Sequence, residues 1–447
     1  MRLSLTPLAL LCVCLAARAA APSQRADYPE LAQRGTNAVG VRQVEVIDPN
    51  RVNFLQSDLA TGKVTLGDRH IFVTIWYPAA SGDAKTVTHY DRHPGAGPGS
   101  PYENSAQFQE TGLAIPDAAP QKGTAPLVIL SHGFTNWAAY TSELAETLAS
   151  RGYVVASIDH DDIPYKPGSN PGLAFVDTSS GRARDQRAVA SRLRALSTDS
   201  AFPLAGSYDP DNLALIGYSM GGFGLLESAG AGYDANGNLF KLLPKPPFQG
   251  LLDDPAAQAH ATPIPGLKAL VLLAPWGGQP ANRSWSAAAL ATISVPTLVV
   301  DGDHDDVAGF DEGVKWIYDS LKSSDRYLLV FENARHNIVG AEAPEAVFGT
   351  FSKIESFDEP VWRKDRIRAI DDHFIVAFLA RSLHNDAAMD PYLNPPTLRS
   401  SDGTWPLKPG QNVGGTYAGK DQPNYWPGFQ RRWALGLSLQ HDKPSTK

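Results

Sequence analysis

Cysteine is almost absent from this sequence of 447 residues, which holds only Cys12 and Cys14. Both lie in the first 19 residues, which have the pattern of a secretory signal peptide: Arg2, a mostly apolar stretch, and small residues at Ala17 and Ala19. We therefore expect a secreted or periplasmic protein whose mature chain has no thiol. That would exclude disulfides, thiolate metal sites and cysteine catalysis.

Long apolar runs and a basic surface are lacking as well. Beyond residue 26, no uncharged apolar run approaches the ~18 residues that a transmembrane helix needs. The chain has 39 Lys and Arg against 47 Asp and Glu, a net charge of −8, and no basic stripe. We therefore expect neither nucleic-acid binding nor an integral membrane span after the signal is cleaved.

What the sequence does contain is an alternation of short apolar strands with longer helical patterns. Several strands are continuous runs of leucine and β-branched residues, typical of strands covered on both faces. The alternation predicts an α/β fold with a mostly parallel, doubly wound sheet and helices on both faces. We expect strands at 70–77, 126–131, 153–159, 213–218, 269–274, 297–300 and 326–332. We expect helices at 137–150, 181–196, 219–229, 311–321 and 365–384.

The alternation is interrupted in places that suggest a domain organisation. We expect residues 1–19 to be the signal peptide and residues 40–390 to form the main domain. The Pro-containing stretch 230–266 is predicted to be an insertion near the site and a possible lid. The extension 391–447 is too rich in aromatic residues for a disordered tail, so we expect it to pack on the main domain.

The motif with the clearest chemistry is Gly-Tyr-Ser-Met-Gly at 217–221, a G-x-S-x-G pattern. Its context is a buried-strand run before it and a sequence that can open a helix after it. A tight strand-to-helix turn needs small residues two places either side of the serine, because their Cα atoms approach neighbouring backbone. Such a turn exposes the hydroxyl beside a helix N-terminus, which favours negative charge. Ser219 is therefore the predicted nucleophile; the alternative is a glycine-rich packing turn.

A serine hydroxyl is a poor nucleophile without a base, and in enzymes with this turn the acid and then the histidine follow the serine. His336 comes a few residues after the last predicted strand and is the candidate base. Three acids, Asp303, Asp305 and Asp306, follow the strand before it. We choose Asp305, because a turn at 302–303 would direct it back at His336. Asp303 and Asp306 remain alternatives, and their other role would be to stabilise the turn.

Residues 131–134, Ser-His-Gly-Phe, follow another predicted strand. Enzymes with a G-x-S-x-G turn place an oxyanion donor in this position. We therefore expect the backbone N–H groups of Phe134 and Met220 to be the two oxyanion donors. His132 is then expected to form a hydrogen bond within its loop rather than to act in catalysis.

Two charged runs have simpler predicted roles. Asp-His-Asp-Asp at 159–162 resembles an oxygen-rich metal site, but consecutive acids cannot all face one ion without a loop such as that of an EF-hand. We expect it to be a surface loop or a wall of the active site, and we expect no metal and no cofactor. Arg-Ala-Arg-Asp at 182–185 opens a helical pattern and is predicted to be a solvated or ion-paired helix terminus.

With these motifs the chain resembles secreted bacterial α/β-hydrolases of the predicted dienelactone hydrolase or platelet-activating-factor acetylhydrolase type. The resemblance rests on Thr-Ile-Trp-Tyr-Pro at 74–78, on the motifs at 131–134 and 217–222, and on Val-Pro-Thr-Leu at 295–298 followed by the acid and His336. It implies an α/β-hydrolase fold and a serine carboxylic-ester hydrolase without cofactor. Dienelactone hydrolases proper use a cysteine where this chain has Ser219, so lactone hydrolysis is not implied.

Ala-Pro-Trp at 274–276, followed by the segment 295–298, is similar to bacterial cutinases and poly(ethylene terephthalate) hydrolases. That resemblance implies that Phe134, Met220 and Trp276 line the ester cleft; the alternative for Trp276 is a core position. The chain lacks the C-terminal disulfide of those enzymes and adds the stretch 230–266 and the C-terminal extension. Polyester hydrolysis is therefore an alternative to the hydrolysis of small esters.

The prediction is an ester hydrolase with a Ser-His-Asp triad that acts through an acyl-enzyme on a small-molecule or polymeric ester. Two other functions compete with it. A serine peptidase of the same fold would usually carry a large separate domain that gates substrate, which this chain has no room for before its first core strands. A catalytically inactive binding protein would not be expected to keep both the triad order and the oxyanion positions.

Overall fold

A computed structural model describes residues 25–58, 60–80, 88–92, 108–160, 162, 171–242, 262–405 and 423–445. The predicted signal peptide lies outside these ranges, as do residues 243–261 of the predicted insertion and 406–422 of the extension. Within the described ranges, no helix is both long and apolar enough to cross a membrane.

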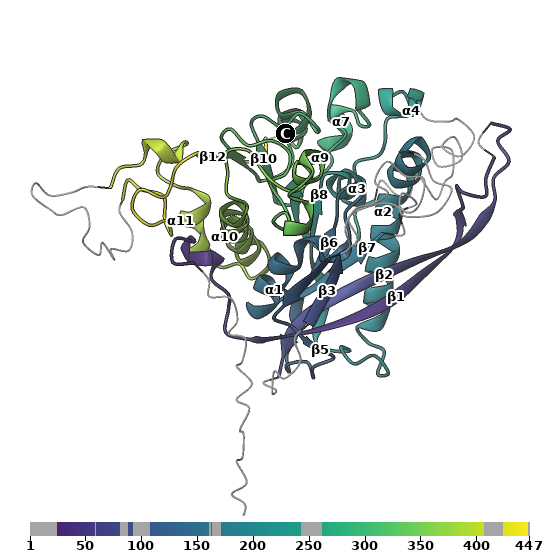
Figure 1. The fold of residues 1–447 in the computed structure, drawn as a ribbon, viewed down its shortest axis with the longest axis horizontal. Coiled ribbons are helices and arrows are strands. Elements are labelled where there is room, and N and C mark those ends of the chain that lie inside the picture. The colour runs from purple at the N-terminus through teal and green to yellow at the C-terminus, as the bar shows by residue number, and fades with distance from the viewer. Residues whose placement is uncertain are drawn as a thin grey trace, which may run out of the picture.

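A ten-stranded sheet runs through the molecule (Figure 1). Its strands are β1 (Ala38–Val52), β2 (Leu66–Ala79), β5 (Ile115–Pro116), β6 (Ala125–Ser131), β7 (Val154–Asp159), β8 (Tyr208–Tyr218), β9 (Leu267–Leu273), β10 (Thr297–Gly302), β11 (Arg326–Phe331) and β12 (Leu437–Asp442). They lie in the order β12-β11-β10-β9-β8-β6-β7-β2-β1-β5. Strands β6 to β11 are mutually parallel, whereas β2 and β12 are antiparallel to their central neighbours. A separate pair is formed by β3 (Thr88–Arg92) and β4 (Phe108–Gly112).

The helices follow the strands. The α-helices are α1 (Ser142–Ser150), α2 (Pro171–Leu196), α3 (Met220–Ser228), α4 (Asn238–Leu242), α7 (Ala287–Leu290), α8 (Trp316–Ser320), α9 (Phe351–Ile354), α10 (Lys364–Leu383) and α11 (Asp390–Leu393). Shorter turns are η1 (Glu30–Ala32), η2 (Ala138–Thr141), η5 (Pro280–Asn282), the π-helical η6 (Phe310–Lys315), η7 (Glu345–Val347), η8 (Ala387–Met389) and η9 (Ser400–Asp402).

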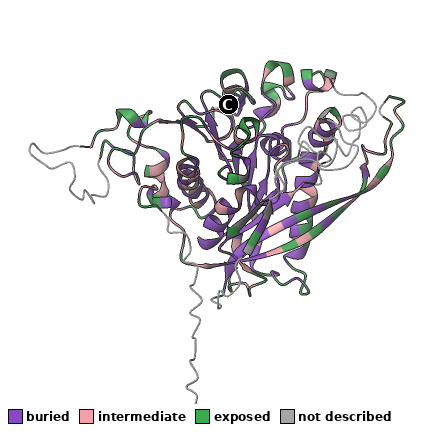
Figure 2. Ribbon diagram, in the orientation of Figure 1, coloured by how far each residue is buried: buried purple, intermediate pink, exposed green. Residues whose placement is uncertain are grey.

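The central strands are buried on both faces, as their continuous apolar runs predicted (Figure 2). On β6, Val128 and Leu130 pack into a cluster with α1 and α10. The alternate residues Leu127 and Ile129 pack into a second cluster with α2 and α3 on the other face. The predicted doubly wound, mostly parallel α/β sheet is thus confirmed.

The predicted strands and helices are all present, with some changes of bounds. Helix α2 begins at Pro171 rather than at residue 181. Proline suits the first turn of a helix, and a polar side chain in the added turns has a partner: Asp177 pairs with Arg69 of β2 at 3.1 Å. Five strands were not predicted: β1, β3, β4, β5 and β12. β1 contains Pro49 and several charged residues, which are unusual in a strand interior.

The C-terminal extension lies against the sheet. Its strand β12 pairs antiparallel with β11, from Arg326 opposite Asp442 to Phe331 opposite Leu437. Trp426 is buried in the same cluster as α10. The division of the chain at residues 390 and 391 stays a prediction.

Candidate active site

Ser219 occupies the turn between β8 and α3, so the predicted strand–turn–helix context is confirmed. Its φ of 49° lies in the left-handed region that residues with a side chain rarely adopt. The backbone is held there by three hydrogen bonds. Ser219 N–H donates to Leu273 O at 2.9 Å, and Ser219 O accepts from Phe223 N–H at 2.9 Å and from Trp276 N–H at 3.2 Å. Such strain persists only where the surrounding structure fixes it, and it is concentrated at functional sites.

The glycines on either side of Ser219 are required by close backbone contacts. A Cβ on Gly217 would lie 2.6 Å from the carbonyl carbon of Gly221. A Cβ on Gly221 would lie 2.0 Å from the carbonyl oxygen of Ser131. The predicted need for small residues is thus confirmed. The turn packs directly on the end of β6, which brings Ser219 beside the loop at 131–134.

The structure brings Ser219, His336 and Asp305 together in one hydrogen-bonded chain. His336 Nε2 lies 3.0 Å from Ser219 Oγ, and His336 Nδ1 lies 2.7 Å from Asp305 Oδ2. All three side chains are buried. With Nδ1–H donated to the carboxylate, Nε2 is the acceptor that faces the serine hydroxyl. These are the contacts that a nucleophile, a base and an orienting acid require.

Asp305 is held as a carboxylate. Burial by itself would raise the pKa of Asp305. Three interactions outweigh burial and lower this pKa below its ordinary value: the hydrogen bond from His336, the charge of His336 and the hydrogen bond from Ala308 N–H. Oδ1 accepts hydrogen bonds from Val307 N–H at 2.7 Å and Ala308 N–H at 2.9 Å. Its negative charge can therefore stabilise a protonated imidazole.

The two alternative acids are engaged elsewhere. Asp303 Oδ1 accepts a hydrogen bond from Asn333 N–H at 2.6 Å. Asp306 forms an exposed ion pair with Arg335. The structure therefore brings Asp305 to His336. Asp303 instead joins the loop after β10 to the loop after β11, and Asp306 lies at the surface.

A fourth acid, Asp301 on β10, escaped the sequence analysis. It is fully buried in the strand. Burial, and after it the Asp305 carboxylate, raise the pKa of Asp301 well above its ordinary value. This shift favours the neutral carboxylic acid, which can donate a hydrogen bond to Asp305. Its place inside a β-branched run gave no sign of this role.

The two expected oxyanion donors belong to residues near the nucleophile: Met220 follows Ser219 in the chain, and Phe134 lines the same cavity as Ser219. Met220 is the first residue of α3, so its N–H has no acceptor within the helix. Phe134 belongs to the loop after β6, and this loop is ordered by His132, whose Nδ1–H donates to Gly133 O at 2.7 Å. The hydrogen bond of His132 within its own loop is as predicted. Burial lowers the pKa of His132 well below its ordinary value, so its ring is neutral.

A cavity of about 600 Å³ opens beside Ser219 and His336. This volume lies within the ~300–1,000 Å³ typical of small-molecule sites. Aromatic side chains line part of it: Phe134, Trp137, Tyr140, Tyr218 and Phe357. Charged side chains line another part: Asp306, Arg335, Lys353, Glu355, Asp358 and Glu359. An ester carbonyl could therefore reach Ser219 from a cavity that both aromatic and charged side chains line.

Trp276 is not among the residues that line this cavity. It is buried, and its ring lies 5.8 Å from that of Phe223 and 5.4 Å from that of Phe175. Its contact with the nucleophile is through the backbone, because Trp276 N–H donates to Ser219 O at 3.2 Å. A role for the Trp276 side chain in substrate binding stays a prediction, while the packing agrees with the core alternative.

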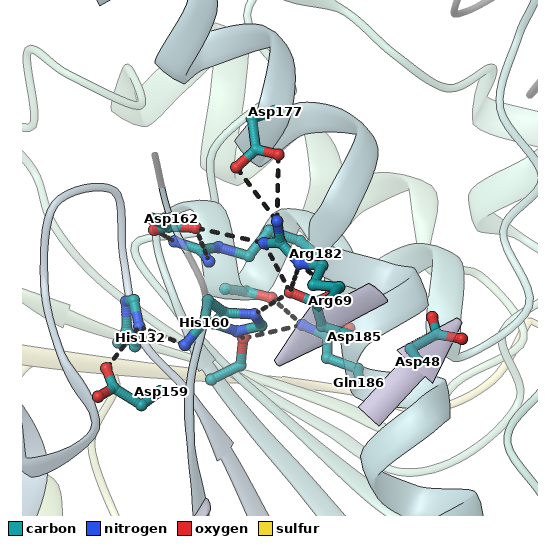
Figure 3. Close-up of polar contacts among 12 residues, drawn as sticks. Asp48, Arg69, His132, Asp159, His160, Asp162, Asp177, Arg182, Asp185 and Gln186 are labelled. Atoms are coloured by element: carbon teal, nitrogen blue, oxygen red, sulfur yellow. Dashed lines mark hydrogen bonds and ion pairs between the residues drawn. The ribbon is translucent and has the colours of Figure 1, made fainter. Parts of the chain in front are cut away.

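The charged runs at 159–162 and 182–185 lie where sequence reasoning did not expect them. His160 and Asp162 are buried rather than part of a surface loop or a wall of the cavity, and Asp161 lies outside the described residues. Arg182 and Asp185 are ion-paired, which was one of the two predicted alternatives, but they are fully buried in the middle of α2 rather than at a helix terminus. These side chains can be buried because each charge is paired with an opposite charge from another part of the chain (Figure 3). No group of three potential metal ligands was found among the described residues.

Comparison with known proteins gives one family and several relatives. The profile of the PET hydrolase-like family matches residues 114–249, which include Phe134 and Ser219. Cutinase est1 of Thermobifida alba is 28% identical over 217 residues, 48% of this chain and 55% of the cutinase. Bis(hydroxyethyl) terephthalate hydrolase of Streptomyces coelicolor is 28% identical over 217 residues, 48% of this chain and 51% of the relative. Cutinase 1 of Thermobifida cellulosilytica is 27% identical over 235 residues, 52% of this chain and 67% of the cutinase.

The chain spans about half the length of the first two relatives. Together with the sheet topology, these matches confirm the α/β-hydrolase fold and the predicted likeness to cutinases and PET hydrolases. The likeness to predicted dienelactone hydrolases and platelet-activating-factor acetylhydrolases stays a prediction.

Proposed function

We propose that this chain is a serine carboxylic-ester hydrolase with Ser219 as nucleophile, His336 as base and Asp305 as orienting acid. The observation that carries the proposal is the pair of contacts of 3.0 Å and 2.7 Å that join these three side chains. The cutinases and the bis(hydroxyethyl) terephthalate hydrolase among the relatives support it, because their names describe ester hydrolases.

In the acylation half-reaction, Ser219 Oγ attacks the ester carbonyl carbon while His336 Nε2 takes the hydroxyl proton. Asp305 stabilises the imidazolium that forms. The carbonyl oxygen becomes an oxyanion that accepts hydrogen bonds from the backbone N–H groups of Phe134 and Met220. As the oxyanion collapses, the bond to the alkoxide breaks, and His336 gives its proton to that leaving group.

In the deacylation half-reaction, His336 takes a proton from water, and the resulting hydroxide attacks the acyl carbon on Ser219. Collapse of the second oxyanion returns the proton to Ser219 Oγ and releases the carboxylic acid. In these two half-reactions, every proton is held by a residue of the triad, by the substrate or by water. The chemistry therefore needs no metal and no cofactor.

Turnover of p-nitrophenyl acetate is the direct test. We expect hydrolysis by the wild type, and we expect Ser219→Ala to lower kcat by on the order of 10⁶-fold. An aminoacyl-p-nitroanilide serves as the matched amide substrate. Faster cleavage of the anilide than of the ester would favour the peptidase alternative, and no turnover of either would favour a binding protein.

A second candidate function is the hydrolysis of aromatic polyesters or their fragments. One relative is named for the hydrolysis of bis(hydroxyethyl) terephthalate, and the five aromatic side chains of the cavity can pack on an aromatic acyl group. Bis(hydroxyethyl) terephthalate and a poly(ethylene terephthalate) film test it separately. Release of soluble products from the film supports a polyesterase; cleavage of the small diester alone limits the activity to soluble esters.

We also propose that the protein is secreted or periplasmic and that residues 1–19 are removed. The apolar stretch after Arg2 and the small residues at Ala17 and Ala19 support this. Mass spectrometry of the N-terminus of protein from the culture medium or periplasm tests it. A chain that keeps Met1 would contradict it.

A further inference from the structure

A buried polar network lies beneath the loop that carries Phe134 (Figure 3). Helix α2 contributes Arg182 and Asp185 to it, and the ends of β6 and β7 contribute His132 and His160. Arg69 reaches it from β2 and bonds to Asp185 at 2.9 Å. The proposed mechanism uses none of these side chains, and burying several charges is costly unless each is paired.

Arg182 is the member of the network that touches the proposed site. Its Nη1 and Nη2 donate to the two carboxylate oxygens of Asp162 at 2.9 Å and 2.8 Å, a bidentate pair that fixes the plane of the guanidinium. Its Nη2 also donates to the carbonyl oxygen of Gly133 at 3.0 Å. The same oxygen accepts from His132 Nδ1–H at 2.7 Å and from Asn136 N–H at 3.3 Å, so Arg182 is the charged one of three donors. The Arg182 side chain is fully buried, so water does not compete for its bond to Gly133.

The bond to Gly133 O acts on Phe134 because both atoms belong to one peptide group. The carbonyl of Gly133 and the N–H of Phe134 lie in the same plane, and in a trans peptide they point in opposite directions. Holding the carbonyl therefore aims the N–H. A charged donor at the carbonyl also polarises the peptide and strengthens its N–H as a donor.

The other proposed oxyanion donor is held in the same way but without a charge. Met220 N–H belongs to the peptide of Ser219, whose carbonyl accepts from Phe223 N–H at 2.9 Å and Trp276 N–H at 3.2 Å. Both peptides are thus fixed through their carbonyl oxygens. Only the peptide of Phe134 is fixed by a cation.

The rest of the network anchors Arg182 and the loop to each other. Ser131 Oγ lies 2.9 Å from His160 Nε2, and His160 Nδ1 lies 2.8 Å from Asp185 Oδ2. This chain has the connectivity of a catalytic triad, but Ser131 and His160 are buried and do not line the cavity beside Ser219. It ties the end of β6 to the helix that carries Arg182.

We infer that Arg182, held by Asp162, is a positioning residue that orients and polarises the Gly133–Phe134 peptide so that Phe134 N–H stabilises the oxyanion. The inference rests on the proposed ester hydrolysis. Its consequence is specific, because the bond strengthens an interaction made with the transition state and not with the bound ester. Loss of the bond should lower kcat and leave KM unchanged.

The test variant is Arg182→Met with Asp162→Asn, which removes the cation without leaving a buried carboxylate unpaired. Its control is Arg69→Met with Asp177→Asn, a buried pair 3.1 Å apart in the same network. Arg69 also contacts Asp185 at 2.9 Å and lies 3.8 Å from Asp162, so this control removes a buried ion pair next to the same carboxylates and leaves the bond from Arg182 to Gly133 in place. The measurements are kcat and KM for p-nitrophenyl acetate, and the inhibition constant of phenylboronic acid, whose tetrahedral serine adduct resembles the oxyanion.

We expect the Arg182 variant to lose about 10- to 100-fold in kcat, below the ~10²–10³ for outright loss of an oxyanion donor, with KM unchanged. Its affinity for phenylboronic acid should fall by a similar factor, while the Arg69 control keeps kcat within about threefold despite a lower melting temperature. An equal loss of kcat in the control, or a loss confined to KM, would overturn the inference.

If the double variant fails to fold, the kcat of the Arg182→Lys variant tests the inference instead. Lysine keeps the charge beside Asp162 but cannot fork to Asp162 and Gly133 together, so kcat should fall about tenfold at unchanged KM. Wild-type kcat in this variant would overturn the inference. Failure of the proposed function is distinguishable, because then the wild type itself would neither hydrolyse the ester nor react with a fluorophosphonate.

Discussion

The imidazole of His336 meets a different partner at each nitrogen, and the partner at Nδ1 sets the tautomer. Asp305→Asn puts an amide where the carboxylate accepts the Nδ1 proton at 2.7 Å, so the proton moves to Nε2 and the base is lost. We expect kcat for p-nitrophenyl acetate to fall roughly 10⁴-fold. Asp303→Asn and Asp306→Asn are the matched controls and should stay within a few-fold of the wild type. A large loss of kcat in Asp306→Asn, with little loss in Asp305→Asn, would refute the assignment.

The raised pKa of Asp301 leads to a prediction about the pH dependence of folding stability rather than about the catalytic rate. Because its folded pKa is raised, the neutral form suits the fold, while in the unfolded chain the carboxyl ionises above pH ~4. Its contribution to stability is therefore complete below pH ~4 and is lost as pH rises, by up to about 1.4 kcal/mol per pH unit. Asp301→Asn stays neutral and can still donate to Asp305. Melting temperatures should match the wild type near pH 4 and exceed it at pH 8; the opposite trend would contradict a protonated Asp301.

Some of these residues could be found from sequence and others could not. Ser219, Asp305 and His336 each follow an apolar run in the order that such enzymes use, and that local signal was sufficient to choose them. Arg182 gave no comparable signal, because its partner Asp162 and the carbonyl it holds meet it only in the folded chain. A charged run on a helix looks the same in sequence whether it faces water or a buried carboxylate.

The strands that could be predicted from the sequence are those that are buried on both faces of the sheet. Strand β6, for example, carries apolar residues at every position but the last, Ser131, so its sequence alone identifies it as a buried strand. Strand β1 was missed because its buried and exposed residues alternate irregularly around Pro49. Strand β12 was missed because its pairing with β11 depends on a contact across more than a hundred residues of chain.

The side chain of Trp276, which comes just after β9, could serve the core or the substrate site, and a substitution distinguishes the two. Its packing against Phe223 and Phe175 predicts that Trp276→Ala lowers the free energy of unfolding by about 3–5 kcal/mol, the usual cost of emptying a core position. The ratio of kcat/KM for an aromatic ester to that for the acetate ester should stay the same. A change of that ratio by roughly 2- to 13-fold, with little change in melting temperature, would instead place the Trp276 side chain against substrate.

The molecule as a whole collects the proposed site at one edge of its sheet. The loops after β6, β8, β10 and β11 supply the parts, and the carboxyl ends of parallel strands meet at a common edge. This arrangement brings Ser219 to His336 across 117 positions of sequence and Asp305 to His336 across 31. The central claim is that this edge holds a single activated serine.

A fluorophosphonate probe tests that claim most directly, because it reacts only with a serine whose hydroxyl is activated by a base. Intact protein is labelled, digested and mapped by mass spectrometry, with Ser219→Ala and His336→Ala as controls. We predict that the label falls on Ser219 alone, that Ser219→Ala takes up none, and that His336→Ala reacts far more slowly. A label on another serine, or full labelling of Ser219→Ala, would contradict the account.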